Sequence, residues 1–172
     1  MKKFTRRELL FASLSAIAIA VVGILLLWNP TAVVILVRHA EKANDGTDNP
    51  PLSAAGTARA DELARVLEFV DLNAVYATTY QRTQLTATPT AIAKNLTPVL
   101  QNDLDQLETA LKSSWSTTLV VGHSNTVPDL VNRLAGTSLA DLPESEYDHM
   151  FVVYRTRWGG RRLVHLQYGA NN

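Results

Sequence analysis

Three short apolar runs predict buried β-strands, and each is followed closely by a basic or imidazole side chain. Val33 to Val37 is apolar without polar alternation, which is typical of a strand buried on both faces of a parallel sheet. It runs directly into Arg38 and His39. Residues 117–121 repeat the pattern and lead to Gly122 and His123, while the shorter run 74–77 leads to Arg82. Because ligands bind beyond the carboxyl ends of such strands, we expect these side chains to share one crevice.

The segments between these strands have the spacing of amphipathic helices. Ser53 is a suitable cap for a helix over about 53–69, and further helices are predicted over 80–94, 104–112 and 126–134. Thr126 to Asp129 has the form of a capping box. A third strand over 96–100 and a terminal hairpin of 151–155 with 163–167 complete the pattern. The alternation predicts a three-layer α/β fold, with a mostly parallel central sheet and helices on both faces.

The amino-terminal pattern differs, because residues 9–28 contain no charge and are almost entirely apolar. Twenty residues reach about 30 Å as a helix, the thickness of a bilayer core, so we expect a transmembrane anchor or uncleaved signal. A cleaved signal peptide is the alternative, but the apolar run is long for one. The basic tail 1–8 favours a cytoplasmic amino terminus. We therefore expect a single-pass protein of the bacterial inner (cytoplasmic) membrane, with a linker at 29–32 and a domain over 33–172 facing the periplasm or exterior.

Composition narrows the chemistry. The chain has 16 basic and 16 acidic side chains. Four of the basic and one of the acidic side chains precede the apolar segment, so the rest of the chain has a formal charge of about −3. Such a domain has no general electrostatic attraction for nucleic acid. The absence of cysteine excludes disulfides, thiolate metal sites and cysteine nucleophiles.

Four of the strand-end residues suit phosphate chemistry. Arg38 and Arg82 can hold a dianionic phosphate through the paired donors of their guanidinium groups. A neutral imidazole such as His39 can act as a nucleophile, and His123 can add positive charge opposite a phosphoryl group. A metal held by His39, His123 and Glu41 is conceivable by ligand type, but the sequence has no His-x-x-x-His spacing.

Four segments containing these residues resemble the histidine phosphatase (phosphoglycerate mutase-like) superfamily, in its short Arg-His-Ala-Glu branch. They are Leu-Val-Arg-His-Ala-Glu-Lys (36–42), Leu-Ser-x-x-Gly-x-x-Arg-Ala (52–60), Tyr-Ala-Thr-Thr-Tyr-Gln-Arg-Thr-Gln-x-Thr-Ala (76–87) and Val-Val-Gly-His-Ser-Asn-Thr-Val-Pro (120–128). The resemblance implies that His39 is the nucleophile and that Arg38, Arg82 and His123 bind the phosphate. It implies no metal and no organic cofactor. Ala40 stands where the family usually has glycine.

The proton donor for the leaving group is less clear from the sequence. Glu41 and Asp103 are the candidates, with Asp105 nearby. Their alternative interpretations are a solvated loop residue for Glu41 and helix amino-terminal charges for the two aspartates.

The resemblance predicts a phosphomonoester hydrolase that acts on a small phosphorylated substrate outside the cytoplasm, such as an envelope sugar phosphate. Two alternatives remain open. A non-catalytic, membrane-anchored module could bind phosphorylated ligands with the same residues. A protein phosphohistidine phosphatase would fit the short domain but would require that domain to be cytoplasmic.

Overall fold

The computed structural model describes residue 7, residue 15, residues 17–23 and residues 31–169, and its contacts divide the chain into units 1–30 and 31–172. In the first unit, residues 17–23 are helical. Within the described residues, no helix has the length and apolarity needed to cross a membrane. Most of the predicted anchor, residues 9–28, lies outside the described residues, so the anchor stays a prediction.

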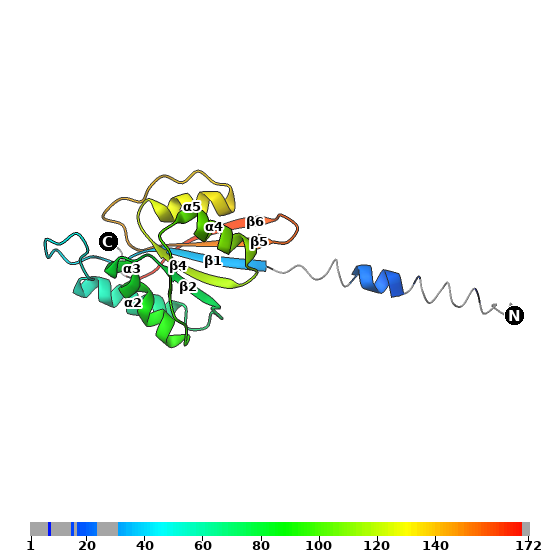
Figure 1. Ribbon diagram of the computed structural model, residues 1–172, viewed down its shortest axis with the longest axis horizontal. Coiled ribbons are helices and arrows are strands. Elements are labelled where there is room, and N and C mark those ends of the chain that lie inside the picture. The colour runs from blue at the N-terminus through cyan, green and yellow to red at the C-terminus, as the bar shows by residue number, and fades with distance from the viewer. Residues whose placement is uncertain (1–6, 8–14, 16, 24–30, 170–172) are drawn as a thin grey trace. The chain divides into compact units, whose positions relative to one another are not determined.

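The second unit is built on one six-stranded sheet with the order β3-β2-β4-β1-β5-β6 (Figure 1). The first four strands in this order are parallel, and β5 and β6 form an antiparallel hairpin that extends the sheet beside β1. The sheet is therefore mixed. The strands are β1 Thr31–Arg38, β2 Ala74–Ala77, β3 Val99–Leu100, β4 Thr117–Gly122, β5 His149–Thr156 and β6 Arg161–Gln167.

Helices cover both faces of the sheet, as the sequence pattern predicts. Helices α2 (Ala54–Val66) and α3 (Gln81–Ala93) pack on one face, where Leu63 and Ala87 join a core with Ile35 and Val37 of β1. Helices α4 (Leu104–Ser113) and α5 (Thr126–Ala135) pack on the other, against Leu36. Since alternate β1 residues enter different cores, both faces of the strand need apolar side chains.

Two predicted elements differ in detail. Strand β3 has only two residues, because Leu96 is drawn into the turn that ends α3: its N–H donates to Ala91 O at 2.9 Å. The capping box predicted at Thr126 does not form. Asn125 is the N-cap of α5, and the Thr126 hydroxyl instead accepts a hydrogen bond from the backbone N–H of His123 at 2.9 Å.

The start of α2 is fastened to the chain just beyond β1. The Ser53 side chain caps the helix by accepting from Gly56 N, and Ser53 N donates to Glu41 O at 2.9 Å. A Cβ atom at Gly56 would overlap that Glu41 carbonyl oxygen. Glycine at this position therefore lets the helix approach the backbone that follows His39.

Replacing Gly56 with alanine should destabilise the domain, although alanine is normally better than glycine inside a helix by about 1 kcal/mol. Displacing the Glu41 backbone should cost about 1–3 kcal/mol, enough to lower Tm by roughly 3 °C or more in a thermal melt. The exposed neighbour Thr57→Ala is the matched control and should leave Tm nearly unchanged. A Gly56→Ala variant as stable as the wild type would contradict the close approach.

Candidate active site

An open pocket of about 640 Å³ lies at the carboxyl ends of the parallel strands. Its walls come from the segments that follow four strands: His39 after β1, Arg82 after β2, Asn102 after β3 and His123 after β4. The loop between α5 and β5 adds Glu144. The structure thus brings together the four residues that the sequence analysis selected, Arg38 among them, at the edge where a doubly covered sheet binds ligands.

His39 is almost completely buried, with its ring fixed by one hydrogen bond. Its Nδ1 lies 2.8 Å from the carbonyl oxygen of Ala40. A carbonyl oxygen only accepts, so Nδ1 carries the proton and Nε2 has the free lone pair. Burial, followed by the charges of Arg38, His123 and Arg82, lowers the His39 pKa from 6.5 to about 4 against the opposing effect of the Ala40 bond. The ring is therefore neutral at pH 7.

His123 is the second imidazole, and its ring centroid lies 5.4 Å from that of His39. Its Nε2 is 3.0 Å from the Thr78 hydroxyl, which is 2.8 Å from the Thr83 hydroxyl. The Thr83 hydroxyl also lies within hydrogen-bond distance of the carbonyl oxygens of Thr78 and Tyr80, to which it can only donate. The hydroxyl of Thr78 thus holds the His123 ring in place at the pocket wall.

Arg38, Lys42 and Arg82 give the pocket a positive charge. Burial first, and then the charges of Arg82 and Arg38, lower the pKa of His123 to about 4. The amino-terminal end of α5, at Asn125 and Thr126, also lines the pocket and favours an anion.

Both arginines have a buried Nε–H without a hydrogen-bond partner among the described residues. Arg82 stacks on the Tyr80 ring at 4.4 Å and forms no ion pair within the described part of the chain. The Arg38 side chain is 1% exposed, and its Nη1 donates to the carbonyls of Pro143 and Glu146 at 2.7 and 3.0 Å. Buried donors are nearly always satisfied, so these two Nε–H groups point to an anionic ligand.

The chain matches the family model of the histidine phosphatase superfamily (branch 1) over residues 34–109, which include Arg38, His39 and Arg82. This segment of the chain is thus similar to the histidine phosphatase superfamily.

Solved structures agree with this similarity at the level of the fold. The protein histidine phosphatase SixA complexed with tungstate has a TM-score of 0.66 at 18% identity, covering 78% of this chain and 96% of that chain. The putative phosphohistidine phosphatase SixA from Nakamurella multipartitia has a TM-score of 0.63 at 21% identity, covering 81% and 98%. A putative alpha-ribazole-5'-P phosphatase from Escherichia coli str. K-12 has a TM-score of 0.64 at 17% identity, covering 81% and 99%. No curated protein matches the chain.

Glu41, one of the two proton donors predicted from the sequence, does not line the pocket. Its carboxylate accepts hydrogen bonds from Arg59 Nε and Nη2 at 2.8–3.1 Å, and Arg59 Nη1 also donates to Tyr168 O. Burial acts to raise the Glu41 pKa, but the bonds and charge of Arg59 outweigh it and the pKa is lowered. Glu41 is neither a pocket acid nor a solvated loop residue. It is half of a structural ion pair.

Asp103, the other predicted donor, also lies outside the pocket lining. Its side chain caps α4 by accepting from the backbone N–H groups of Asp105 and Gln106. These bonds lower its pKa despite a small opposing effect of desolvation. Asp105 forms an ion pair with Arg133 at 2.6 Å. Both aspartates are therefore charges at the amino terminus of α4, as their alternative interpretation predicted.

Among the described residues, Glu144 is the only carboxylate that lines the pocket, and it was not predicted from the sequence. Its Oε2 lies 3.0 Å from Arg38 Nη2 and its Oε1 accepts from the Ser124 hydroxyl at 3.0 Å. The bond from Ser124 and the charge of Arg38 lower its pKa. The side chain is 74% exposed. An acidic stretch after α5 was visible in the sequence, but nothing there distinguishes Glu144 from Glu146.

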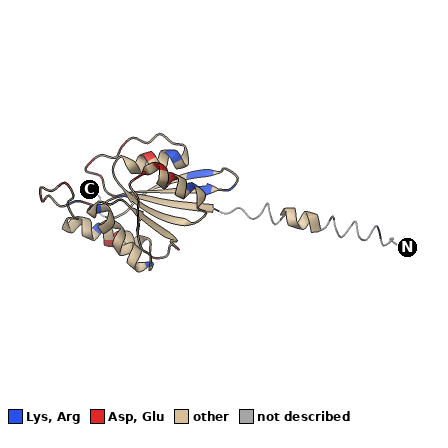
Figure 2. Cartoon of the chain, viewed as in Figure 1, with Lys and Arg blue, Asp and Glu red and all other residues tan. Residues whose placement is uncertain are grey.

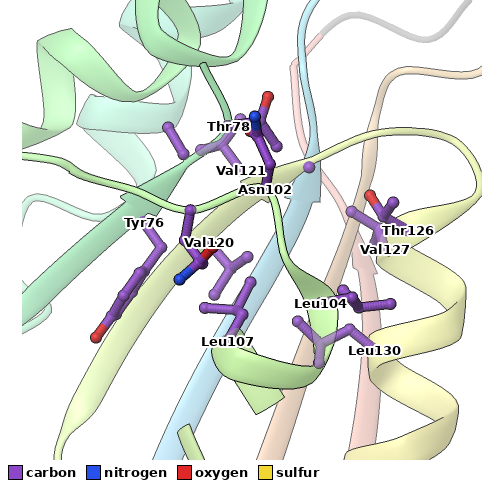
Figure 3. A pocket seen from close by; sticks show the side chains of 13 residues that line it. Tyr76, Thr78, Asn102, Leu104, Leu107, Val120, Val121, Thr126, Val127 and Leu130 are labelled. Carbon is purple, nitrogen blue, oxygen red and sulfur yellow. The ribbon is translucent and has the colours of Figure 1, made fainter. Parts of the chain in front are cut away.

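A second, much smaller cavity of about 20 Å³ lies beside the pocket, between β2, β4, α4 and α5 (Figure 3). It shares Thr78, Asn102 and Thr126 with the larger pocket, while Leu104, Leu107 and Leu130 make its deeper wall apolar. Its volume is about that needed for one water molecule. The cavity is therefore a packing gap and not a substrate site.

The remaining histidines, His149 and His165, lie outside the pocket and form a hydrogen bond with each other. His149 Nδ1 lies 2.7 Å from His165 Nε2, and His149 Nε2 lies 2.6 Å from a carboxylate oxygen of Glu146. Within residues 31–169 and the shorter described segments, no three His, Asp, Glu or Cys side chains are grouped so that they could hold a metal ion.

The two pocket histidines should titrate well below the ordinary histidine range. We expect imidazole NMR resonances of His39 and His123 to stay those of neutral rings from pH 7 to 5 and to change near pH 4. Inorganic phosphate should move the midpoints upward, because a bound anion favours the charged ring. Variants His39→Gln and His123→Gln assign the resonances. Midpoints near 6.5 in the free protein would contradict the burial of the two rings.

Proposed function

We propose that this chain is a phosphomonoester hydrolase of the histidine phosphatase superfamily that works through a phosphohistidine intermediate on His39. The observation that carries the proposal is the neutral His39 ring with a free Nε2, beside two arginines whose buried Nε–H groups have no partner within the described residues. A phosphate dianion would accept from both guanidinium groups, with its phosphorus facing the imidazole.

The reaction follows from the tautomer. The Nε2 lone pair forms a bond to phosphorus while the bond from phosphorus to the leaving oxygen breaks. The His39 ring gains positive charge, which the Ala40 carbonyl stabilises through the Nδ1–H bond. Arg38 and Arg82 offset the negative charge on the phosphoryl oxygens in both steps. Water then attacks phosphorus, the N–P bond breaks, and phosphate leaves.

The leaving oxygen needs a proton, and we assign Glu144 as its source. Within the described residues it is the only carboxylate at the pocket wall. A phosphate dianion on Arg38 would repel the Glu144 carboxylate and raise its pKa, which favours proton uptake as the substrate binds. The protonated acid can then give its proton to the leaving oxygen and recover one from the attacking water.

As substrate we propose a phosphorylated compound outside the cytoplasm, such as an envelope sugar phosphate. The predicted anchor and its basic tail support the compartment. The open pocket of about 640 Å³ is large enough for a sugar phosphate. Neighbours of similar fold include structures named as an alpha-ribazole-5'-P phosphatase and a glucosyl-3-phosphoglycerate phosphatase, which supports a phosphorylated small molecule.

A protein phosphohistidine phosphatase is the second candidate, favoured by the structures named as SixA. Its leaving group would be an imidazole, and the domain would have to lie on the cytoplasmic side. An anchored module that binds phosphate ligands without turnover is the third. The experiments below separate these candidates.

The full chain should hydrolyse p-nitrophenyl phosphate in the presence of a chelator, and His39→Ala should lower kcat by about 10³-fold or more, because the nucleophile is lost. Acid-labile phosphate should appear on the wild-type chain after a rapid quench and be absent from the variant. His165→Gln, outside the pocket, is the control and should retain full activity. Phosphate binding without turnover would favour the binding module, and equal activity in His39→Ala would rule out the phosphohistidine mechanism.

Replacing Glu144 with glutamine should have an effect that depends on the leaving group. For an alkyl phosphate, whose leaving oxygen needs protonation, kcat should fall by about 10²-fold. For p-nitrophenyl phosphate, whose leaving group departs as a stable anion, kcat should change only a few-fold. Glu146→Gln makes the same charge change in the same loop, and Glu41→Gln removes the acid predicted from the sequence.

Neither control should discriminate between the two substrates. An equal loss on both substrates in Glu144→Gln would show that the residue supports the pocket without giving a proton. A selective loss in Glu41→Gln would return that role to Glu41. A phosphohistidine phosphatase would instead prefer a phosphohistidine peptide over both esters, with little dependence on Glu144.

A further inference from the structure

The turn of the β5–β6 hairpin and its flanking residues, 155–162, form a basic segment that the proposed reaction does not use. We call this segment the hairpin end. It contains Arg155, Arg157, Arg161 and Arg162 and no acidic side chain. Figure 2 shows blue segments gathered at this end of the hairpin.

The hairpin end is positive on both faces of the sheet. Arg155 pairs with Arg161 and Tyr154 with Arg162, and neighbouring residues of a strand point to opposite faces. Arg157, Arg161 and Arg162 are exposed, and within the described part of the chain none of the four arginines forms an ion pair. Burial and then the charge of Arg161 lower the Arg155 pKa, so the positive charge is not compensated locally.

Exposed tryptophans accompany these charges. Trp158, in the turn itself, is 64% exposed, and Trp115, just before β4, is 44% exposed. The Arg155 guanidinium lies 5.7 Å from the Trp115 ring centroid, and its Nη groups donate to the carbonyls of Leu111 and Lys112. Tryptophan beside arginine is the combination enriched where proteins meet the headgroup region of a membrane.

The hairpin end lies at the amino-terminal end of β1, whereas the pocket lies beyond its carboxyl-terminal end. Thr31, the first residue of β1, pairs with Thr156, whereas Val37 near the other end of β1 pairs with Met150. Only Asn29 and Pro30 separate Thr31 from the predicted anchor 9–28. Such a linker spans at most about 10 Å when extended. If residues 9–28 cross a bilayer, the chain length alone keeps the hairpin end close to the headgroups.

We propose that the hairpin end is a contact surface for an anionic lipid bilayer, with Arg157, Arg161 and Arg162 on the headgroup phosphates and Trp158 at the headgroup level. The inference uses the predicted anchor and does not depend on the proposed reaction. The domain as a whole is slightly acidic, so a local basic end would also orient it, with its acidic remainder away from an anionic surface. Binding to an acidic protein is the competing interpretation.

The lack of native cysteine allows a direct test with the full chain. A polarity-sensitive fluorophore is attached to Trp158→Cys, or to the control Asn44→Cys, which lies exposed in the loop between β1 and α2. Each protein is reconstituted into phosphatidylcholine vesicles with and without phosphatidylglycerol. We expect the emission at position 158 to shift to the blue with phosphatidylglycerol and to return in high salt. The emission at position 44 should not change.

A triple variant, Arg157→Gln/Arg161→Gln/Arg162→Gln, combined with Trp158→Cys, tests the charges. Each arginine removed should weaken the contact with the anionic surface by about fivefold, so the shift should be lost at the same lipid composition. An unchanged Tm would show that the variant is folded. Equal emission at position 158 in both kinds of vesicle would overturn the proposal and favour a protein partner. A shift that survives the triple substitution would also overturn it, because the arginines would then not be the lipid contact.

Discussion

The structure depends on the burial of β1 between two cores. Its alternate side chains, Ile35 and Val37 on one face and Leu36 on the other, enter different helix-covered layers, while β4 and β5 occupy both of its edges. Both faces and both edges of β1 are therefore covered, and only the residues at and beyond its carboxyl end can reach the pocket. Arg38 and His39 therefore emerge in fixed positions, and burial of the His39 ring follows from the same packing. The neutral state of the imidazole in a positive pocket is thus a consequence of the fold.

The features that the sequence could predict are those governed by local pattern and by chain order. Continuous apolar runs predict the strands, and helical spacing predicts the helices that cover them. Because the carboxyl ends of parallel strands lie at one edge of a sheet, Arg38, His39, Arg82 and His123 could be expected to lie together there, as they do. The Leu-Ser-x-x-Gly-x-x-Arg segment, recognised from the sequence only as part of a resemblance, acquires a physical reason. Ser53 caps α2, Gly56 admits the backbone of Glu41, and Arg59 binds its carboxylate.

The carboxylate that we propose as proton donor could not be identified in this way, because its position depends on long-range contacts. Glu41 adjoins the nucleophile in sequence, yet a carboxylate that can reach Arg59 on α2 turns away from the pocket. Glu144 is more than one hundred residues from Arg38 along the chain, and hydrogen bonds from Arg38 to the Pro143 and Glu146 carbonyls bring its loop to the pocket. Arg38 thus both holds that loop and lines the pocket. Proximity in sequence favoured Glu41, whereas only the folded contacts place Glu144 at the pocket.

The length of β1 sets the distance between the hairpin end and the pocket. Eight residues of strand separate Thr31 from Arg38, a length of roughly 25 Å at about 3.3 Å per residue. If the hairpin end rests on lipid, the pocket opens at about that height and faces away from the bilayer. A phosphate within the headgroup layer would then be out of reach, and the enzyme would act on soluble esters or on phosphates carried by a long glycan. The anchor would confine the domain to a membrane without presenting it with membrane lipid, so an envelope sugar phosphate fits this geometry better than a phospholipid does.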